Sequence, residues 1–502
     1  MTRRFARIAE ILKDCSKSSR RLSIITLAFL SIATTATGLA QTELPPPGPT
    51  KSANIPAIRE FQLPNGLRVA VVEKKSVPLV TAYLLIRSGA DSESEENAGL
   101  AKITATMLTR GTASRSAEKI AEDIEFLGGS IDSGAGRLSS FVTVTVTTGK
   151  LASALSIFSD VVLRPKFAEE ELAFLKSQTL DELKFSLTQP GFLANYVASK
   201  AVFGEHPVGG TPESIRKITS ADIKAFYKDF YRPANATLIF VGDISPLTAR
   251  SLSMAVFGSW HSEPERENGV SHIGENSNKP VLDPSLVLII DLPNSGQSAV
   301  NYFLRLASVK RNSPDYYTAS VYNSILGGGY SSRLNQEIRI KRGLSYGAGS
   351  SFQWRANYVN FSARAQTKNE SAPEVAKLMT EEINRLADQR VAESELIPRK
   401  SVLIGSFGRG LETTASLATN LAELYSLGVQ VKAINDYISK IDAVQPEQIR
   451  NFANDIKSKG TIVIVGDYAK FRQSLDKMLP NHKVRVVSAV DLNLSGPLFW
   501  TK

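Results

Sequence analysis

The segments ATLIFVGDI (Ala236–Ile244) and GTIVIVGDY (Gly460–Tyr468) decide the fold, because they are nearly the same strand placed twice in one chain. Each is a short apolar run rich in β-branched residues that ends in Val-Gly-Asp, and this pattern predicts a buried strand. Each follows a stretch with helical spacing of apolar residues, SADIKAFYKDFY before the first and QPEQIRNFANDI before the second. Ser220 can cap the first of these helices. The chain therefore holds two copies of one structural unit.

The residues upstream of these strands keep the same order in both copies. In the first copy, a hairpin with Pro64-Asn65-Gly66 at its turn and an apolar strand precede two helices, and the alternating strand SSFVTVTVTT follows. In the second copy, SLVLIIDLP and SAVNYFLRLAS are expected strands, DYYTASVYNSILGGG and SSRLNQEIRIKRG are expected helices, and YVNFSARAQTK is an alternating strand. The predicted fold class is α+β: two homologous α/β-sandwich domains, each a mainly antiparallel sheet packed with helices, joined by a linker.

These patterns divide the chain into six segments. A polar stretch rich in Gly, Pro and Asn, without periodicity, separates the two copies and predicts a linker. The expected segments are a signal peptide at 1–40, a Pro-rich spacer at 41–57, an N-terminal domain at 58–259, the linker at 260–284, a C-terminal domain at 285–490 and a tail at 491–502.

The first forty residues differ in composition from the rest. Seven Lys or Arg residues precede the apolar run LSIITLAFLSIATTATGLA, which ends in small residues at Gly38 and Ala40. This order predicts a cleaved secretory signal and a bacterial periplasmic protein, with an uncleaved membrane anchor as the alternative. Cleavage would lower the formal net charge from +10 to +5 and remove Cys15, the one cysteine. No basic run interleaved with aromatic residues then remains to indicate nucleic-acid binding.

The stretch NAGLAKITATMLTRGT (Asn97–Thr112) predicts the first helix of the N-terminal domain. Its apolar face carries Leu100, Ile103, Met107 and Leu108 at helical spacing. The opposite stripe carries Lys102, Ala105 and Thr106, at the positions from which a helix can offer two metal ligands and a base to one point. Zinc prefers imidazole, thiolate or carboxylate, and none of these three side chains provides one.

Several motifs together resemble the pitrilysin and mitochondrial processing peptidase family. They are the duplicated unit, the Gly111-Thr112 pair that closes this helix, FVGDI at the end of the first copy, and LGGGYSSRLNQEIRIKRGLSY in the second. The resemblance runs from about Ile58 to about Val490 and implies the processing-peptidase fold. Zinc peptidases of that family carry an inverted motif, H-x-x-E-H, ahead of the Gly-Thr pair.

Carried onto this sequence, the family's zinc site loses most of its ligands. The first His falls on Lys102, the Glu base on Ala105, the second His on Thr106 and a distal Glu ligand on Glu182. Catalytic zinc needs about three protein ligands, so the sequence predicts no metal in this chain. Lys102 could instead pair with Glu182, which we state as a hypothesis. The histidines outside this motif, His206, His261, His272 and His482, share no i, i+4 spacing and are interpreted as surface or structural residues.

A second constellation in the resemblance is complete. Arg339 lies in an expected helix, Gly343 can end that helix in the left-handed conformation, and Tyr346 begins the next strand, so the chain reversal can bring guanidinium and phenol toward one side. In the family, the matching Arg and Tyr bind the substrate backbone and help stabilise the tetrahedral intermediate, which suits a phenol donor and an Arg fork. The alternative is an Arg and a Tyr that only pack a helix end.

Two other motifs are weaker. Residues 343–347 match G-x-S-x-G around Ser345, and Asp388 and His482 follow in the order that an α/β-hydrolase uses. That motif requires a strand before and a helix after, whereas here a helix precedes and a strand follows. Gly327-Gly328-Gly329 lacks the GK[ST] of a phosphate loop and is interpreted as a helix-to-helix turn.

The resemblance therefore implies a noncatalytic subunit of a secreted two-component zinc metallopeptidase. Such a subunit would supply Arg339 and Tyr346 to a homologous partner that carries H-x-x-E-H and the zinc, and the two together would act on peptide substrates. Two alternatives stay open: a structural assembly subunit with no part in catalysis, and a serine hydrolase that uses Ser345.

Overall fold

The computed structural model describes residues 57–261, 282, 286–480 and 482–494. The expected signal peptide, the spacer up to residue 56, most of the linker and the tail from residue 495 lie outside the described residues. The described residues belong to one compact unit. Within these ranges, no helix combines the length and the hydropathy that crossing a membrane requires.

The first half builds a six-stranded sheet in the order β1-β2-β6-β3-β5-β4. Its strands are β1 (Ile58–Gln62), β2 (Arg68–Glu73), β3 (Leu79–Ile86), β4 (Ser130–Ala135), β5 (Ser140–Thr147) and β6 (Ala236–Gly242). All neighbours are antiparallel except β2 and β6, which are parallel. The expected hairpin is confirmed, since β1 pairs with β2 and Gly66 at its turn has φ +91°.

The second half builds another six-stranded sheet, in the order β12-β7-β11-β8-β10-β9. Its strands are β7 (Leu286–Asp291), β8 (Ser298–Leu306), β9 (Ser345–Trp354), β10 (Val359–Thr367), β11 (Thr461–Gly466) and β12 (Lys483–Ser488). The two Val-Gly-Asp strands, β6 and β11, occupy the same place in their sheets, each parallel to the first long strand of its half. The expected duplication is confirmed for five strands, and β12 takes in the second sheet the edge position that β1 takes in the first.

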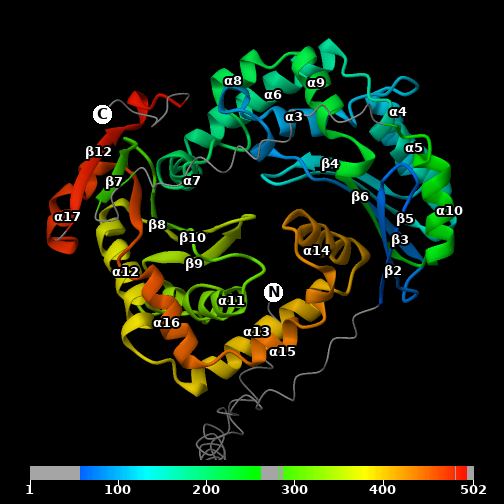
Figure 1. Ribbon diagram of the computed structural model, residues 1–502. Coiled ribbons are helices and arrows are strands. Elements are labelled where there is room, and N and C mark those ends of the chain that lie inside the picture. The colour runs from blue at the N-terminus through cyan, green and yellow to red at the C-terminus, as the bar shows by residue number, and fades with distance from the viewer. Residues whose placement is uncertain (1–56, 262–281, 283–285, 481, 495–502) are drawn as a thin grey trace, which may run out of the picture. The chain divides into compact units, whose positions relative to one another are not determined.

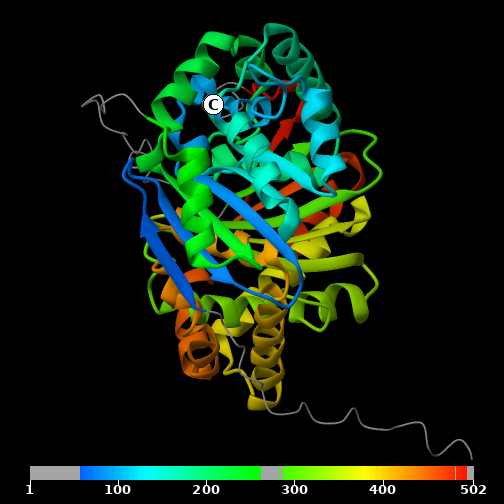
Figure 2. The ribbon, with the colours of Figure 1, turned by 90° about the vertical axis from the view of Figure 1, so that its right-hand side faces the viewer.

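Helices surround both sheets. The first half has α3 (Leu100–Met107), α4 (Ala117–Phe126), α5 (Leu151–Leu163), α6 (Glu169–Leu187), α7 (Pro190–Ala201), α8 (Pro212–Lys217), α9 (Ser220–Phe230) and α10 (Pro246–Phe257). Figure 2 views the first sheet from the side of α10, which contacts β2 and α5. The expected cap of α9 is wrong by one residue: the N-cap is Thr219, which forms a capping box with Asp222, and Ser220 is the first helical residue.

The second half repeats this helical pattern. It has α11 (Asp315–Leu326), the π-helical segment η8 (Asn335–Ile340), α12 (Ala372–Asp388), α13 (Glu393–Gly410), α14 (Thr414–Ser426), the 3₁₀ turn η10 (Val431–Ile434), α15 (Tyr437–Asp442), α16 (Pro446–Ile456) and α17 (Arg472–Met478). The helix expected over SSRLNQEIRIKRG is present, but most of it is π-helical rather than α-helical.

Each half contributes one helix that packs against the sheet of the other half. Helix α14 of the second half covers a face of the first sheet, where Leu417 and Leu421 pack in one cluster with Val72 and Ile239 (Figure 1). Helix α7 of the first half contacts β8 and β11 of the second sheet. Each sheet therefore buries apolar surface against a helix from the other repeat, and the repeats share packed cores. No observation tests the exact bounds expected for the two domains.

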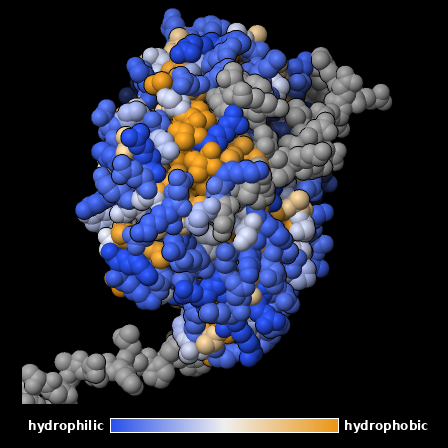
Figure 3. Space-filling model, turned by 90° about the vertical axis from the view of Figure 1, so that its left-hand side faces the viewer, coloured by the Kyte–Doolittle hydropathy of each residue, from blue (hydrophilic) through white to orange (hydrophobic). Residues whose placement is uncertain are grey.

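The strand β12 forms an edge of the second sheet and lies on the face seen in Figure 3, where apolar side chains gather beside hydrophilic ones. Val484 and Val486 on this strand are 37% and 42% exposed. Lys483 and Arg485 alternate with them, and charged side chains on an edge strand disfavour pairing with the edge of another sheet.

Candidate functional site

Helix α3 carries three of the degenerate metal-site positions, and the stripe expected opposite its apolar face is only partly accessible. Its apolar residues are buried, with Ile103 and Met107 at 3% and 1% exposure. Lys102 is exposed and Thr106 is half-buried, whereas Ala105 is fully buried. The Thr106 hydroxyl donates to the Lys102 carbonyl, 2.9 Å away, so it satisfies its own helix rather than reaching outward.

Lys102 and Glu182 line the same cavity, of about 550 Å³, which we call the degenerate-site cavity. Its wall also includes Arg137, Arg355, Phe192 and Tyr196. Among the described residues no ion pair within 4.0 Å joins Lys102 to Glu182, so their direct pairing stays a hypothesis.

The residues present do not fit a zinc ion. The four positions that match the family's site carry an ammonium, a methyl group, a hydroxyl and a carboxylate, and only the carboxylate of Glu182 is a zinc ligand type. In the part of the chain that the structure describes, no group of three or more His, Cys, Asp or Glu residues is placed to hold a metal ion.

A buried carboxylate caps the helix that carries this degenerate site. Glu93, 3% exposed, accepts hydrogen bonds from the backbone amides of Gly99 and Ala101 at 2.7 and 2.6 Å. His206 Nε2 lies 3.2 Å from the same carboxylate, which makes this histidine structural. Burial raises the pKa of Glu93, and the hydrogen bonds from His206 and the two amides oppose that rise. Gly99 has φ +95°, a conformation that glycine adopts without strain.

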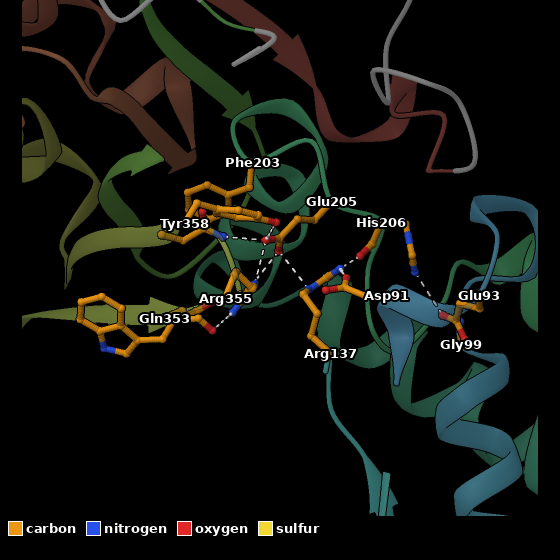
Figure 4. Close-up of polar contacts among 12 residues, drawn as sticks. Asp91, Glu93, Gly99, Arg137, Phe203, Glu205, His206, Gln353, Arg355 and Tyr358 are labelled. Atoms are coloured by element: carbon orange, nitrogen blue, oxygen red, sulfur yellow. Dashed lines mark hydrogen bonds and ion pairs between the residues drawn. The ribbon is translucent and has the colours of Figure 1, made fainter. Parts of the chain in front are cut away.

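A second buried carboxylate, Glu205, joins the two halves at the wall of the same cavity (Figure 4). Arg355 from the second half donates Nε and Nη2 to it at 2.9 and 3.0 Å, and Tyr358 and Asn360 each donate at 2.8 Å. Arg137 Nε from the first half lies 3.1 Å from it. Burial alone would raise the pKa of Glu205, but the two guanidinium charges and these hydrogen bonds lower it to about 2.

Sequence reasoning missed this cluster of Glu205 with its four partners, because its members share no local spacing. Glu205 and Arg355 are separated by 150 positions in the chain. Glu205 follows α7, Arg137 lies in the turn between β4 and β5, and Arg355 follows β9. Only the approach of the two halves brings their charges together.

Arg339 and Tyr346 occupy the end of η8 and the start of β9. Gly343 between them has φ +63°, which confirms the left-handed helix end that the sequence predicts. Its amide donates to the Arg339 carbonyl at 2.9 Å. The Arg339 guanidinium lies over the Tyr330 ring, 5.2 Å from its centroid, and Tyr346 is 89% exposed. Neither residue is part of the degenerate-site cavity's wall as the described residues define it.

Two family models match this chain. Residues 68–209 match "Insulinase (Peptidase family M16)" and residues 217–401 match "Peptidase M16 inactive domain", so together they account for more than half of the chain. The chain belongs to the M16 peptidase family. This result confirms the resemblance drawn from the sequence and the two-sheet α+β fold that it implied.

Bacterial proteins share this M16 organisation over most of the chain. An uncharacterized zinc protease of Streptomyces coelicolor is 24% identical over 80% of this chain and 88% of its own length. A second one, from Bacillus subtilis, is 22% identical over 80% of this chain and 95% of its own. The crystal structure of a peptidase M16 inactive domain from Pseudomonas fluorescens is 27% identical, covers 82% of this chain and 98% of its own, and has a TM-score of 0.73. A protease from Helicobacter pylori has the same fold, with 18% identity, a TM-score of 0.74 and coverage of 82% and 100%.

The Gly-Thr pair that marked the M16 resemblance has a structural role in this chain. Gly111 has φ +123°, and the buried Thr112 hydroxyl donates to Asp160 Oδ2 at 2.7 Å. Ser114 and Arg115 also donate to this oxygen, at 2.7 and 2.6 Å. The pair therefore anchors the loop after α3 to the buried end of α5.

The serine-hydrolase alternative has little support in the geometry of this M16 chain. Ser345 begins β9 directly after the η8 turn, and its hydroxyl donates to the Gly347 carbonyl at 2.7 Å, inside its own turn. Asp388 pairs with Lys457. In the described ranges, no hydrogen bond joins Ser345, Asp388 and His482 into a triad.

Proposed function

We propose that this protein is the noncatalytic subunit of a two-component zinc metallopeptidase. In this proposal a homologous partner with H-x-x-E-H holds the zinc. The two subunits would enclose a common substrate chamber, into which this chain supplies Arg339 and Tyr346. The phenol would donate to the developing oxyanion and the guanidinium would bind the peptide backbone. No zinc is assigned to this chain itself.

One observation carries the proposal: the chain combines a degenerate metal site with an intact Arg and Tyr pair. Of the metal-site positions only Glu182 is a ligand type, whereas the turn between Arg339 and Tyr346 has the left-handed Gly343 and leaves Tyr346 almost fully exposed. An exposed phenol at the start of an edge strand is available to another chain. The basic and then apolar N-terminus supports secretion, with residues 1–40 removed.

The test measures peptide hydrolysis by this chain, by an H-x-x-E-H homologue from the same host, and by their mixture. We expect the purified chain to hydrolyse no peptide and the mixture to exceed the homologue alone. Tyr346→Phe should lower kcat of the mixture about a hundredfold, the usual effect of removing one oxyanion donor, and Arg339→Ala should lower it as well. Tyr330→Phe is the matched control, because it removes the hydroxyl of a nearby exposed tyrosine and keeps the ring beneath Arg339.

Other outcomes would favour the alternatives. If both variants join the complex and leave its activity unchanged, the chain is a structural assembly subunit. One tightly held zinc per purified chain would contradict the proposal directly. Covalent labelling by a fluorophosphonate, abolished in Ser345→Ala, would indicate the serine hydrolase.

A further inference from the structure

A second cavity, of about 520 Å³, lies in the C-terminal half, and no residue of its wall belongs to the degenerate-site cavity. It is enclosed by the start of α11, the segment from Gly428 through η10, α15 and the start of α16. Helices α11, α15 and α16 lie together in Figure 1, and α11 contacts both of the others. Neither Arg339 nor Tyr346 lines it, so the proposed peptidase role does not use it.

Arg311 is one of three cationic residues on the described wall of this cavity. Its guanidinium carbon lies 3.4 Å from the centroid of the Tyr316 ring, which holds the group in place by cation–π contact. Its Nε is buried without a hydrogen-bond partner, and within the described residues the side chain makes no ion pair. A guanidinium fork with a donor that the described chain leaves unpaired suits a carboxylate or a phosphate.

Two lysines add to the positive charge. Lys432 lines the cavity and, among the described residues, has no acidic partner. Lys440 lies 3.6 Å from Asp436 and 5.2 Å from the centroid of the Tyr317 ring. Asp436 is the one acidic residue on the described wall, so it balances Lys440 and leaves Arg311 and Lys432 with a charge of about +2. A phosphate monoester at neutral pH carries a charge of about −1.5 to −2, which would neutralise the positive charge of Arg311 and Lys432.

We propose that this cavity binds a small phosphate monoester. Arg311 and Lys432 would hold the phosphate, because a planar guanidinium fork and a nearby ammonium suit its oxygens. The remaining wall mixes polar and apolar side chains, and its apolar part, with Tyr317, Val429 and Val444, would contact the organic part of the ligand. The volume lies in the usual range for small-molecule sites, about 300 to 1,000 Å³.

Titration calorimetry of the purified full-length protein tests this site, with phenyl phosphate and inorganic phosphate as probes at constant ionic strength. We expect phenyl phosphate to bind and inorganic phosphate to bind more weakly. Arg311→Met and Lys432→Gln should each weaken phenyl phosphate binding about tenfold or more, as loss of a charge-assisted contact does. Lys459→Gln, which removes a surface charge outside the cavity, should change nothing.

A lipid headgroup could supply the same phosphate group, so a second experiment sediments the protein with vesicles that contain or lack phosphatidic acid. Binding to these vesicles without binding to phenyl phosphate would overturn the small-molecule site. Phenyl phosphate binding that both variants leave intact, or no binding by the unmodified protein, would overturn it as well. Lys432→Gln keeps the test decisive if Arg311→Met fails to fold, because Lys432 is exposed and contributes nothing to the core.

Discussion

Asp160, Glu205 and Glu93 are all buried carboxylates, yet the protein shifts their pKa values in different directions. Asp160 and Glu205 each lie beside two guanidinium groups, and the pKa of each falls to about 2 although burial opposes this. Glu93 has two backbone amides and a histidine, and burial raises its pKa. For Asp160 the hydrogen bonds from Ser114, Thr112 and the two guanidinium groups outweigh burial, and for Glu205 the two guanidinium charges do so, whereas the partners of Glu93 do not.

The contact by which Asp160 holds the Gly111-Thr112 loop can be tested by its dependence on pH. Its folded pKa of about 2 lies below the ordinary value of 3.8, so its stabilisation is present above about pH 4 and is lost as the pH falls toward 2. We expect Asp160→Asn to lower the free energy of unfolding by about 2 kcal/mol at neutral pH, with the difference shrinking toward pH 2. Urea unfolding from pH 7 to pH 2 measures it, with exposed Asp476→Asn as control. A difference that does not depend on pH would contradict the assigned ionisation.

At the scale of elements, α3 and α6 carry the positions that the resemblance matches to the family's metal site. Helix α3 contacts α6, and the side chains of Lys102 and Glu182 reach one cavity from these two helices. The apolar face of α3 is buried in the core, and of the opposite stripe only Ala105 is buried as well, whereas Lys102 is exposed and Thr106 is half-buried. The position of the helix therefore depends on its buried apolar residues.

The double variant Lys102→His, Thr106→His tests whether these positions converge on one point. It places two imidazoles at i, i+4 on α3 near Glu182, which supplies a third ligand type, so we expect about one zinc per chain by metal analysis after dialysis. Ala105 is left unchanged, because its position is fully buried and a carboxylate there would be costly. Adding Glu182→Gln should weaken zinc binding more than tenfold. Equal zinc binding with and without Glu182 would show that the two helices do not converge on one metal position.

At the scale of the whole molecule, the two repeats depend on each other. Helices α7 and α14 each cover the other repeat's sheet, and Arg355, Tyr358 and Asn360 of the second half all donate to Glu205 of the first. Arg305 adds a hydrogen bond to the Phe203 carbonyl at 2.9 Å. The repeats are similar in sequence order, but neither buries its apolar surface alone.

Glu205→Gln should therefore weaken the junction between the halves. It would leave Arg355 buried without its counter-charge, which typically costs about 3 to 5 kcal/mol. Chemical denaturation measures the loss, and Glu213→Gln, which breaks an exposed pair with Lys217, is the matched control with an effect below about 1 kcal/mol. Equal effects of the two variants would mean that the buried cluster does not hold the halves together.

Much of the fold could be predicted from local pattern. The strands with clear alternation or continuous apolar runs, such as β5 and β6, are where the sequence places them, and so is the helix end at Gly343. Strand β4 escaped prediction, because SIDSGA carries few apolar residues and is held by pairing with β5. The edge position of β12 could not be predicted from local pattern either, since it depends on pairing with β7, nearly two hundred positions earlier.

The sequence by itself determined the duplicated α+β unit, because short repeated patterns carry it, and its resemblance to the family predicts that α3 lacks zinc ligands and that Arg339 and Tyr346 form a functional pair. Only the tertiary structure decided the packing of α7 and α14 on the sheet of the other half, the charged cluster around Glu205 and the cavity lined by Arg311 and Lys432. Each of these joins groups far apart in the chain. Their approach follows from how two sheets bury their faces, and no local spacing records it.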